Sequence, residues 1–414
     1  MSDEIRARVG ERRDTNDENY PARSALTAHL QRWGLREFDS DAAYFAWQRE
    51  QFSQADITTL HQLVTCKRAP GAGAPEETAF YDATARPHIV PALYSQRYHY
   101  YLAIGPRVVA HIPPAGSVLD FGCGIGLLTT FYAQLFPNVS FLGLDRSPVS
   151  LEYARGRAQA LKLTNIAFDC VDLDRQSMPG GFDLVIATHA LLQAERDPGI
   201  PSTSWQTFGR SHDAQVQAHF EQRTGLVPRL DHLVLALVRE GRMIVFEKTR
   251  LLARRIPFQR ALAGRDLDLI EPPEPVRYSL IEEVAEDGPL YVLGRKRGVA
   301  GWEWDETPEG DNDTNFDLDG IVHRERVGDE PLYENHAASA QRVWAELPDR
   351  HIVKETNRQG DEGHRLHVEL GTTNQGVVYL YVANTFDQRQ LVLIEEARAS
   401  VLESYYRDIE SAET

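Results

Sequence analysis

Residues 117–126, Ser117-Val118-Leu119-Asp120-Phe121-Gly122-Cys123-Gly124-Ile125-Gly126, decide the fold of this chain. The first five are a short, mainly apolar run typical of a buried strand, and glycine then recurs at every second position. Leu127–Phe136 follows with the composition of a helix. A strand, a glycine turn and a helix in this order point the amide groups of the helix N-terminus at whatever lies over the turn. Since glycine also lets a ligand approach the backbone, the stretch predicts a site for a nucleotide-like ligand.

The glycine spacing helps to distinguish between kinds of nucleotide-like ligand. A dinucleotide-binding turn requires G-x-G-x-x-G, whereas this chain has G-x-G-x-G followed by Leu127. Asp120 adds a carboxylate before the turn, which suits a cationic amino acid group better than a pyrophosphate. Asp145 comes 19 residues after Gly126, at the end of the next apolar run, where a carboxylate can hold both hydroxyls of an adenosine ribose. A nicotinamide-dependent oxidoreductase is therefore disfavoured.

Strand-like and helical stretches alternate downstream of the turn. Helices are expected at 148–161 and 230–240, and strands at 139–144, 166–171, 182–187 and 243–246. Strict alternation of this kind predicts βαβ crossovers and a mostly parallel sheet. Two further strands, at 276–284 and 290–293, are separated by Glu286-Asp287-Gly288, which is typical of a hairpin turn and predicts an antiparallel edge.

With these residues in place, the stretch from about residue 94 to 297 resembles the class I S-adenosylmethionine (SAM)-dependent methyltransferases, and most closely their small-molecule branch. Five motifs in order carry the resemblance. They are 118–126, 141–145, Val171-Asp172-Leu173, 182–185 with 188–192, and 238–245, where Arg242 replaces a usual second glycine.

The resemblance implies a Rossmann-like α/β fold, with a seven-stranded methyltransferase sheet, and SAM as the cofactor. It implies that the cofactor-binding residues are Asp120, Gly122, Gly124, Gly126, Asp145, Asp172 and Leu173. The function it implies is transfer of the methyl group of SAM to an O, N or C nucleophile of a small-molecule acceptor. The alternative is a non-catalytic SAM-fold scaffold or regulatory module that acts through its extra domains.

His189 is the candidate catalytic residue, because it follows the fourth strand at the sheet edge where ligands bind in open α/β folds. A histidine has a pKa suited to a general base, but the same residue could simply cap or pack the next helix. Two aromatic groups also allow two interpretations. Tyr94, Tyr98 and Tyr101 lie on one face of a helix expected between residues 91 and 110, and could belong to the core or close over the cofactor. Trp205, Phe208 and His212, in a long connection at 193–225, could cover the acceptor or form a surface excursion packed on the N-terminal helices.

Composition changes along the chain predict five segments. They are a disordered tail at 1–24, an N-terminal helical cap at 25–84, the methyltransferase domain at 85–298, an acidic linker at 299–331, and a small C-terminal α+β domain at 332–414. In the last of these, strands are expected near 351–355, 365–370 and 377–383, with helices near 334–347 and 395–406. This domain could pair two chains into a homodimer, present a surface to another partner, or shape the acceptor site.

The charge balance bears on the partners. The chain has 61 acidic and 44 basic side chains, a formal net charge of −17, which disfavours nucleic acid as a partner. Three separated cysteines indicate neither disulfides nor a zinc site, and the start lacks an apolar signal-peptide core. A partial calcium-loop pattern at 315–320 fails because Arg326 stands where a glutamate is required. We therefore expect a cytoplasmic protein with no metal and no membrane partner.

Overall fold

The computed structural model describes residues 20–69, 73–173, 176, 178–193, 197–295, 302, 316–322 and 330–412. These residues form two compact units. The first comprises residues 1–195, 225–248 and 265–301, and the second comprises residues 196–224, 249–264 and 302–414. The expected helical cap therefore shares a unit with the expected methyltransferase domain. The second unit is assembled from three separate stretches of chain.

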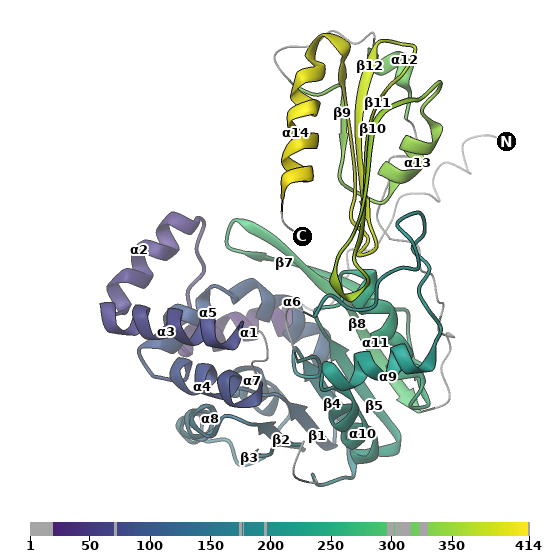
Figure 1. Ribbon diagram of the computed structural model, residues 1–414. Helices are drawn as coiled ribbons and strands as arrows, with labels where there is room; N and C mark the ends of the chain where they lie inside the picture. Colours follow the sequence, from purple (N-terminus) through teal and green to yellow (C-terminus); the bar gives the residue numbers. More distant parts are fainter. Residues whose placement is uncertain are drawn as a thin grey trace, which may run out of the picture. The chain divides into compact units, whose positions relative to one another are not determined.

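The first unit is built on a mixed sheet of eight strands in the order β3-β2-β1-β4-β5-β8-β6, with β7 paired to β8 (Figure 1). Strands β1 to β5 pair in parallel, while β6, β7 and β8 are antiparallel. The bounds are β1 Gly116–Phe121, β2 Val139–Asp145, β3 Ile166–Cys170, β4 Phe182–Thr188, β5 Leu237–Phe246, β6 Leu267–Leu269, β7 Glu274–Leu280 and β8 Glu283–Arg295. The α/β fold with a mostly parallel sheet is confirmed, with one strand more than the seven expected.

Helices of the first unit precede the sheet and alternate with its strands. Their bounds are α1 Tyr20–Arg32, α2 Asp41–Gln51, α3 Gln54–Lys67, α4 Ala74–Thr84, α5 Ile89–Ser95, α6 Tyr98–Val109, α7 Leu127–Leu135, α8 Pro148–Ala160 and α10 Leu226–Ala236. The main core joins α1, α6 and α7 to the sheet, with Leu30, Ile104 and Phe131 almost fully buried. This core fixes the strand order, and hence places the ends of β1 and β4 side by side.

The structure corrects four details of the predicted elements. The helix expected between 91 and 110 is broken at Gln96 and Arg97 into α5 and α6, so Tyr94 lies on a different helix from Tyr98 and Tyr101. Helix α10 ends at Ala236 and β5 begins at once, although a helix was expected to residue 240. Helix α1 begins at Tyr20, inside the predicted tail. Residues 1–19 and most of the predicted acidic linker lie outside the described residues.

The fourth correction concerns the hairpin of β7 and β8. Glu286-Asp287-Gly288 does not form its turn, because β8 runs through these residues and the chain reverses at Ile281 and Glu282. Val276 pairs with Gly288 and Arg277 with Glu286, which leaves Asp287 as an extra residue on β8. Such a β-bulge re-aims a side chain. The acidic, glycine-containing sequence was interpreted as a turn although it belongs to a bulge.

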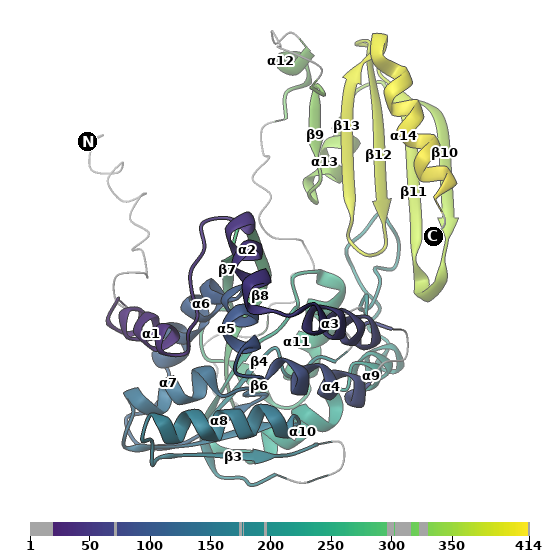
Figure 2. The ribbon, with the colours of Figure 1, turned by 90° about the vertical axis from the view of Figure 1, so that its left-hand side faces the viewer.

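The second unit contains a five-stranded antiparallel sheet in the order β10-β11-β12-β13-β9 (Figure 2). Its elements are α9 Ala214–Arg223, α11 Leu252–Ala263, α12 Leu318–Val322, β9 Tyr333–Asn335, α13 Ser339–Glu346, β10 His351–Gln359, β11 Arg365–Thr372, β12 Val377–Asn384, β13 Arg389–Glu395 and α14 Ala399–Ser411. Alternate residues of β12 face two separate cores, Tyr379 and Tyr381 on the side of α13 and Leu380 on the side of α14. Strand β13 was missed in the sequence.

The long connection at 193–225 lies mostly in this second unit and does not supply the expected aromatic cover as a free loop. The Trp205 ring stacks on His367 with 3.8 Å between ring centroids and packs against the core on the side of α13. The guanidinium group of Arg389 lies over the Phe208 ring. Arg210 forms a buried ion pair with Asp387, which also accepts a hydrogen bond from the Ala253 amide. These contacts fasten both inserted stretches to the C-terminal sheet.

Candidate functional site

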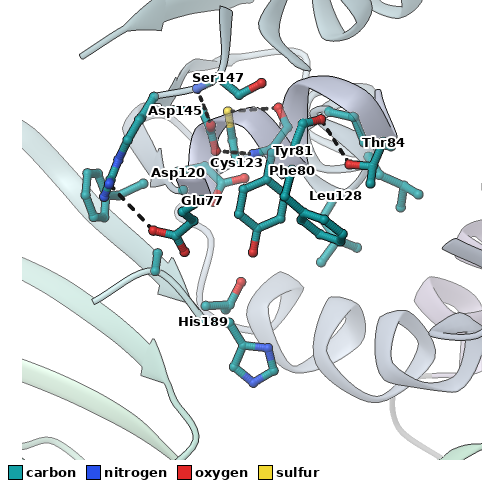
Figure 3. Close-up of a pocket in the computed structure, with 18 of the residues that line it drawn as sticks. Glu77, Phe80, Tyr81, Thr84, Asp120, Cys123, Leu128, Asp145, Ser147 and His189 are labelled. Atoms are coloured by element: carbon teal, nitrogen blue, oxygen red, sulfur yellow. Dashed lines mark hydrogen bonds and ion pairs between the residues drawn. The ribbon is translucent and has the colours of Figure 1, made fainter. Parts of the chain in front are cut away.

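A cavity of 530 Å³ lies at the carboxyl ends of β1, β2 and β4 in the first unit. In open α/β folds ligands bind at this edge, where the strand order reverses between β1 and its neighbours. Helices α3 to α6 complete the cavity with residues that include Lys67, Tyr81 and Arg97. Figure 3 shows Asp145 and Ser147 at one end of the cavity and His189 at the other.

The three glycines of the turn have positive φ angles, but each meets different surroundings. A side chain on Gly124 would meet no atom within 4 Å, so this residue leaves open space above the backbone. On Gly122 an added Cβ would lie 2.4 Å from the Cβ of Ala190. On Gly126 it would collide with Ala154 and the Phe168 ring. Gly124 therefore faces the cavity, while Gly126 is absent from the lining and allows close packing beneath it.

Asp145 closes the turn from the end of β2. Its Oδ2 accepts a hydrogen bond from the Gly124 amide at 2.8 Å, and its Oδ1 accepts one from the Ser147 amide at 2.8 Å. Burial raises the pKa of this carboxyl group, while the amide hydrogen bonds oppose the rise. Each carboxylate oxygen has a second lone pair, so Asp145 can still accept two hydrogen bonds from a ligand.

Asp120 lies at the end of β1 with only 6% of its surface exposed. It accepts a hydrogen bond from the Thr129 hydroxyl at 2.5 Å. Burial, assisted by the charge of Asp145, raises the pKa of Asp120 to about 7, against the opposing effect of Thr129. A cation bound beside it would favour the ionised carboxylate.

Asp172 and Leu173 follow β3 and also line the cavity. The structure thus brings six of the seven expected cofactor-binding residues to one cavity wall, and places Gly126 behind it. We call Asp120, Gly122, Gly124, Asp145, Asp172 and Leu173 the glycine-turn wall.

His189 lies at the opposite end, directly after β4, with 12% of its side chain exposed. Its ring stacks between those of Tyr100 and Phe246, at centroid distances of 5.2 and 5.1 Å. Its φ angle of +54° is unusual for a residue with a side chain, and its amide donates to the Phe246 carbonyl at 2.8 Å. The ring is therefore held in one orientation from both faces and from its backbone.

The two ring nitrogens of His189 face groups of opposite charge. Nδ1 lies 3.3 Å from Nη2 of Arg97, and Nε2 lies 3.1 Å from Oδ2 of Asp287. Because Arg97 can only donate, Nδ1 is the acceptor and the ring proton is assigned to Nε2. Burial lowers the pKa of His189 to about 4, so the imidazole is neutral near pH 7.

Asp287, the extra residue of the β8 bulge, is held by its neighbours. Tyr278 donates a hydrogen bond to it from β7. Burial raises the pKa of Asp287, but His189, Tyr278 and Lys248 outweigh that effect and bring it to about 2. The bulge therefore supplies an ionised carboxylate behind His189. We call Arg97, His189 and Lys248, together with the aromatic residues Tyr81 and Tyr100, the Arg97 wall; all five line the cavity.

Sequence reasoning missed the pair that fixes the chain after His189. Both the Ala190 and Leu191 amides donate to Oε1 of Glu247 at 2.7 Å, and Glu247 is 2% exposed. Nη1 of Arg229 donates to the carbonyls of the same two residues at 3.2 and 3.0 Å. The signal for Glu247 was present, because an acid directly after a strand of the sheet is the same pattern that singled out Asp145.

Sequence reasoning also missed that α4 contributes to the cavity, because this helix was assigned to a separate N-terminal cap. Arg146, next to Asp145, lies 3.5 Å from Glu77, and the Ser147 hydroxyl donates to Asp82 at 2.6 Å. Both acids are on α4. These contacts bring Phe80 and Tyr81 to the cavity lining (Figure 3), so the N-terminal helices are part of the site.

Comparison with known proteins adds to this geometry. Residues 113–211 match a family model described as a methyltransferase domain. This stretch of the chain is therefore similar to a methyltransferase domain. The match begins just before β1 and includes the glycine turn, Asp145 and His189, so both cavity walls contain residues of the matched stretch.

Curated relatives of the methyltransferase domain match over short stretches. A malonyl-[acyl-carrier protein] O-methyltransferase of Acetivibrio thermocellus is 28% identical over 121 residues, which cover 26% of this chain and 40% of the relative. A trans-aconitate 2-methyltransferase of Deinococcus radiodurans is 36% identical over 93 residues, covering 22% and 34%. A ribosomal RNA small subunit methyltransferase C of Pseudoalteromonas translucida is 32% identical over 142 residues, covering 33% and 36%. The chain thus spans two fifths or less of the length of each.

No group of three or more His, Cys, Asp or Glu among the described residues is arranged to hold a metal ion. None of the helices in that part of the chain is long and apolar enough to cross a membrane.

Proposed function

We propose that this chain binds SAM on the glycine-turn wall and transfers its methyl group to a small-molecule acceptor held on the Arg97 wall. The observation that carries the proposal is the shared cavity, in which open space over Gly124 lies beside the buried carboxylates Asp120 and Asp145. The two hydroxyl groups of a ribose can donate hydrogen bonds to the oxygens of Asp145. The positively charged amino acid group of SAM would favour the ionised form of Asp120, whose pKa is raised by burial.

Bound SAM supplies a methyl group on a cationic sulfur, which keeps the bonding electron pair as a neutral thioether when an acceptor nucleophile takes the methyl. The protein's part is to align the nucleophile with the methyl group and to exclude water. Helix α4 covers the cavity and is tied to the turn after β2 through Glu77 and Asp82. The clamp of Glu247 and Arg229 holds the backbone after His189 at the acceptor end.

We propose that His189 acts as a positioning residue rather than as the general base expected from its place in the sequence. Its accepting nitrogen faces the Arg97 guanidinium, and with a pKa of about 4 it is a weak base. Its neutral ring instead connects Asp287 to Arg97 and fixes the direction of the guanidinium group.

We propose that the methyl acceptor is a small molecule rather than RNA. Two of the relatives are named as a malonyl-[acyl-carrier protein] O-methyltransferase and a trans-aconitate 2-methyltransferase, and a third as a ribosomal RNA methyltransferase. The net charge of −17 favours a small molecule over RNA in this chain. Cytoplasmic location and a homodimer formed through the C-terminal domain stay predictions from the sequence.

Isothermal titration with S-adenosylhomocysteine and with NADH, followed by incubation with methyl-labelled SAM and a metabolite extract freed of macromolecules, tests the proposal. We expect S-adenosylhomocysteine to bind, NADH not to bind, and a labelled small molecule to form. Binding of NADH alone would overturn the cofactor assignment. Binding of S-adenosylhomocysteine without any labelled product would favour the scaffold alternative.

A further inference from the structure

Arg97 lies at the break between α5 and α6 and lines the cavity. Its guanidinium group has two neighbours, Nδ1 of His189 at 3.3 Å and the face of the Tyr100 ring at 5.1 Å. Both are uncharged near pH 7, because burial keeps His189 neutral and raises the pKa of Tyr100 to about 12. Among the described residues, no carboxylate lies within ion-pair distance of Arg97.

Two other arginines of the same unit differ from Arg97 in having a carboxylate partner. Arg107, on helix α6, pairs with Glu274 at 2.7 Å, and Arg146, also in the cavity lining, pairs with Glu77. A charge removed from water is costly unless an opposite charge compensates it. Asp287 could do so, but the His189 ring lies between it and Arg97. Arg97 is only partly exposed and faces the cavity, so an anion that enters the cavity is placed to supply its counter-charge.

The charge of the surrounding wall agrees with this. Lys67, Arg68 and Lys248 also line the cavity, and Glu77, an acid of the lining outside the glycine-turn wall, pairs with Arg146. The carboxylates Asp120, Asp145 and Asp172 belong to the glycine-turn wall. In a chain of net charge −17, a wall rich in cations attracts an anion locally.

We propose that Arg97 binds a carboxylate of the methyl acceptor, which makes the acceptor a small carboxylic acid whose apolar part lies against Phe80 and Tyr81. A guanidinium group suits a carboxylate because it can donate two parallel hydrogen bonds. The inference rests on the proposed function, since it names the substrate class of that site. His189, oriented by Asp287, is then the residue that directs Arg97 at the acid.

A carboxylate could also come from the amino acid part of the methyl donor, and a first experiment distinguishes the two sources. The affinity for S-adenosylhomocysteine is measured by calorimetry in the wild type, Arg97→Gln and Arg97→Lys. We expect the three affinities to agree within about twofold, since the donor is held on the other wall. A loss of about tenfold or more in Arg97→Gln would assign Arg97 to the donor and overturn the proposal.

A second experiment asks for the acid directly. The protein saturated with S-adenosylhomocysteine is titrated with 4-hydroxybenzoate and 4-hydroxycinnamate, and with the uncharged amide of each. We expect at least one acid to bind about tenfold or more tightly than its amide, and Arg97→Gln to remove that preference. Equal binding of acids and amides, or binding of neither acid, would overturn the proposal.

The matched control is Arg107→Gln, which removes one positive charge from the same helix outside the cavity lining and should leave the preference for the acid unchanged. Thermal unfolding checks that the variants fold. Arg97→Gln should melt close to the wild-type temperature, because Arg97 is partly exposed to the cavity and has no carboxylate partner among the described residues, whereas a purely structural Arg97 would lower the melting temperature.

The methyl-transfer assay with extract separates failure of this inference from failure of the proposed function. Extract is divided on an anion exchanger at neutral pH, and the acceptor should be in the retained fraction. An acceptor found in the unretained fraction would overturn the inference while supporting methyl transfer. An acid that binds through Arg97 in a protein that methylates nothing would support the anion site and overturn the proposed function.

Discussion

The two walls of the cavity differ in how the chain builds them. The glycine-turn wall consists of residues at or just after the ends of β1, β2 and β3, and its charged side chains are the acids Asp120, Asp145 and Asp172. The Arg97 wall takes Arg97 from a helix break, His189 from the end of β4 and Lys248 from the residues after β5, with Asp287 behind them on a bulge, and its lining is basic. The sheet fixes the positions of residues at neighbouring strand ends. A wall whose residues come from distant elements can differ in its residues from one acceptor to another.

The largest effect is expected on the glycine-turn wall. Asp145→Ala should weaken S-adenosylhomocysteine binding by about 1.5–3 kcal/mol, because it removes charged hydrogen bonds to the ribose and frees the Gly124 amide. Calorimetry measures this loss. Asp169→Ala, an exposed acid on the adjacent strand β3, is the control and should bind normally. An unchanged affinity in Asp145→Ala would show that Asp145 does not bind the ribose. The assignment of the donor to the glycine-turn wall would then lose its support.

The next effect concerns the chain segment that connects the walls. Glu247→Ala should lower the free energy of unfolding by about 1–3 kcal/mol, since the amides of Ala190 and Leu191 lose a buried acceptor. Urea denaturation gives the value. Glu240→Ala, on the exposed part of the same strand β5, should change it by less than about 0.5 kcal/mol. Equal effects of the two substitutions would show that Glu247 does not hold the segment.

A smaller effect should appear with pH. Asp120, with a pKa of about 7, is mostly protonated at pH 6 and mostly ionised at pH 8, and only the ionised form attracts the positive charges of SAM. SAM binding should therefore be about tenfold weaker at pH 6 than at pH 8, as one pKa unit of protonation requires. Asp120→Asn should bind weakly at both values. A wild-type affinity that is independent of pH would separate Asp120 from the cationic part of the ligand.

The smallest effect is expected for the residue that the sequence favoured as catalytic. His189→Asn keeps an acceptor facing Arg97 and should reduce the rate of methyl transfer by less than about tenfold. Loss of a general base would reduce it by about 10²–10⁴-fold. Single-turnover rates with the acceptor isolated from extract, measured between pH 5 and 9, decide between the two. If the rate falls by that much and a titrating group disappears from the pH profile, His189 is the general base and the positioning role is contradicted.

Part of the site could be predicted because its residues are local to strand ends. Asp120, the glycines, Asp145 and Asp172 each lie within a few positions of a strand, so the order of strands along the chain placed them at one sheet edge. The same reasoning placed His189 there, but its role depends on neighbours that the sequence did not reveal. Arg97 lies 92 positions from His189, and Asp287 lies nearly a hundred positions beyond it.

Other details could not be predicted because local patterns allow two structures. Glu286-Asp287-Gly288 has the residues of a turn and forms a bulge, since pairing with β7 continues past it. The sequence left Trp205 either as part of a cover over the acceptor or as part of a surface excursion packed on the N-terminal helices. Trp205 instead stacks on His367 of β11, because only tertiary packing brings these two rings together. Strand β13 was missed, and its residues 389–394 were assigned no regular structure because short apolar runs do not reveal their partners.

The sequence by itself determined the alternation of strands and helices, the glycine turn, and the acids that follow β1 to β3, because each of these depends on a few neighbouring residues. Only the tertiary structure decided that α4 covers the cavity, that Gly126 packs beneath the turn rather than facing the ligand, and that Arg97 lies beside a neutral histidine with no carboxylate partner among the described residues. Those features depend on which side chains, distant in sequence, pack together away from water. The burial and the charge partners of such side chains follow from tertiary packing, and the spacing of residues along the chain does not specify them.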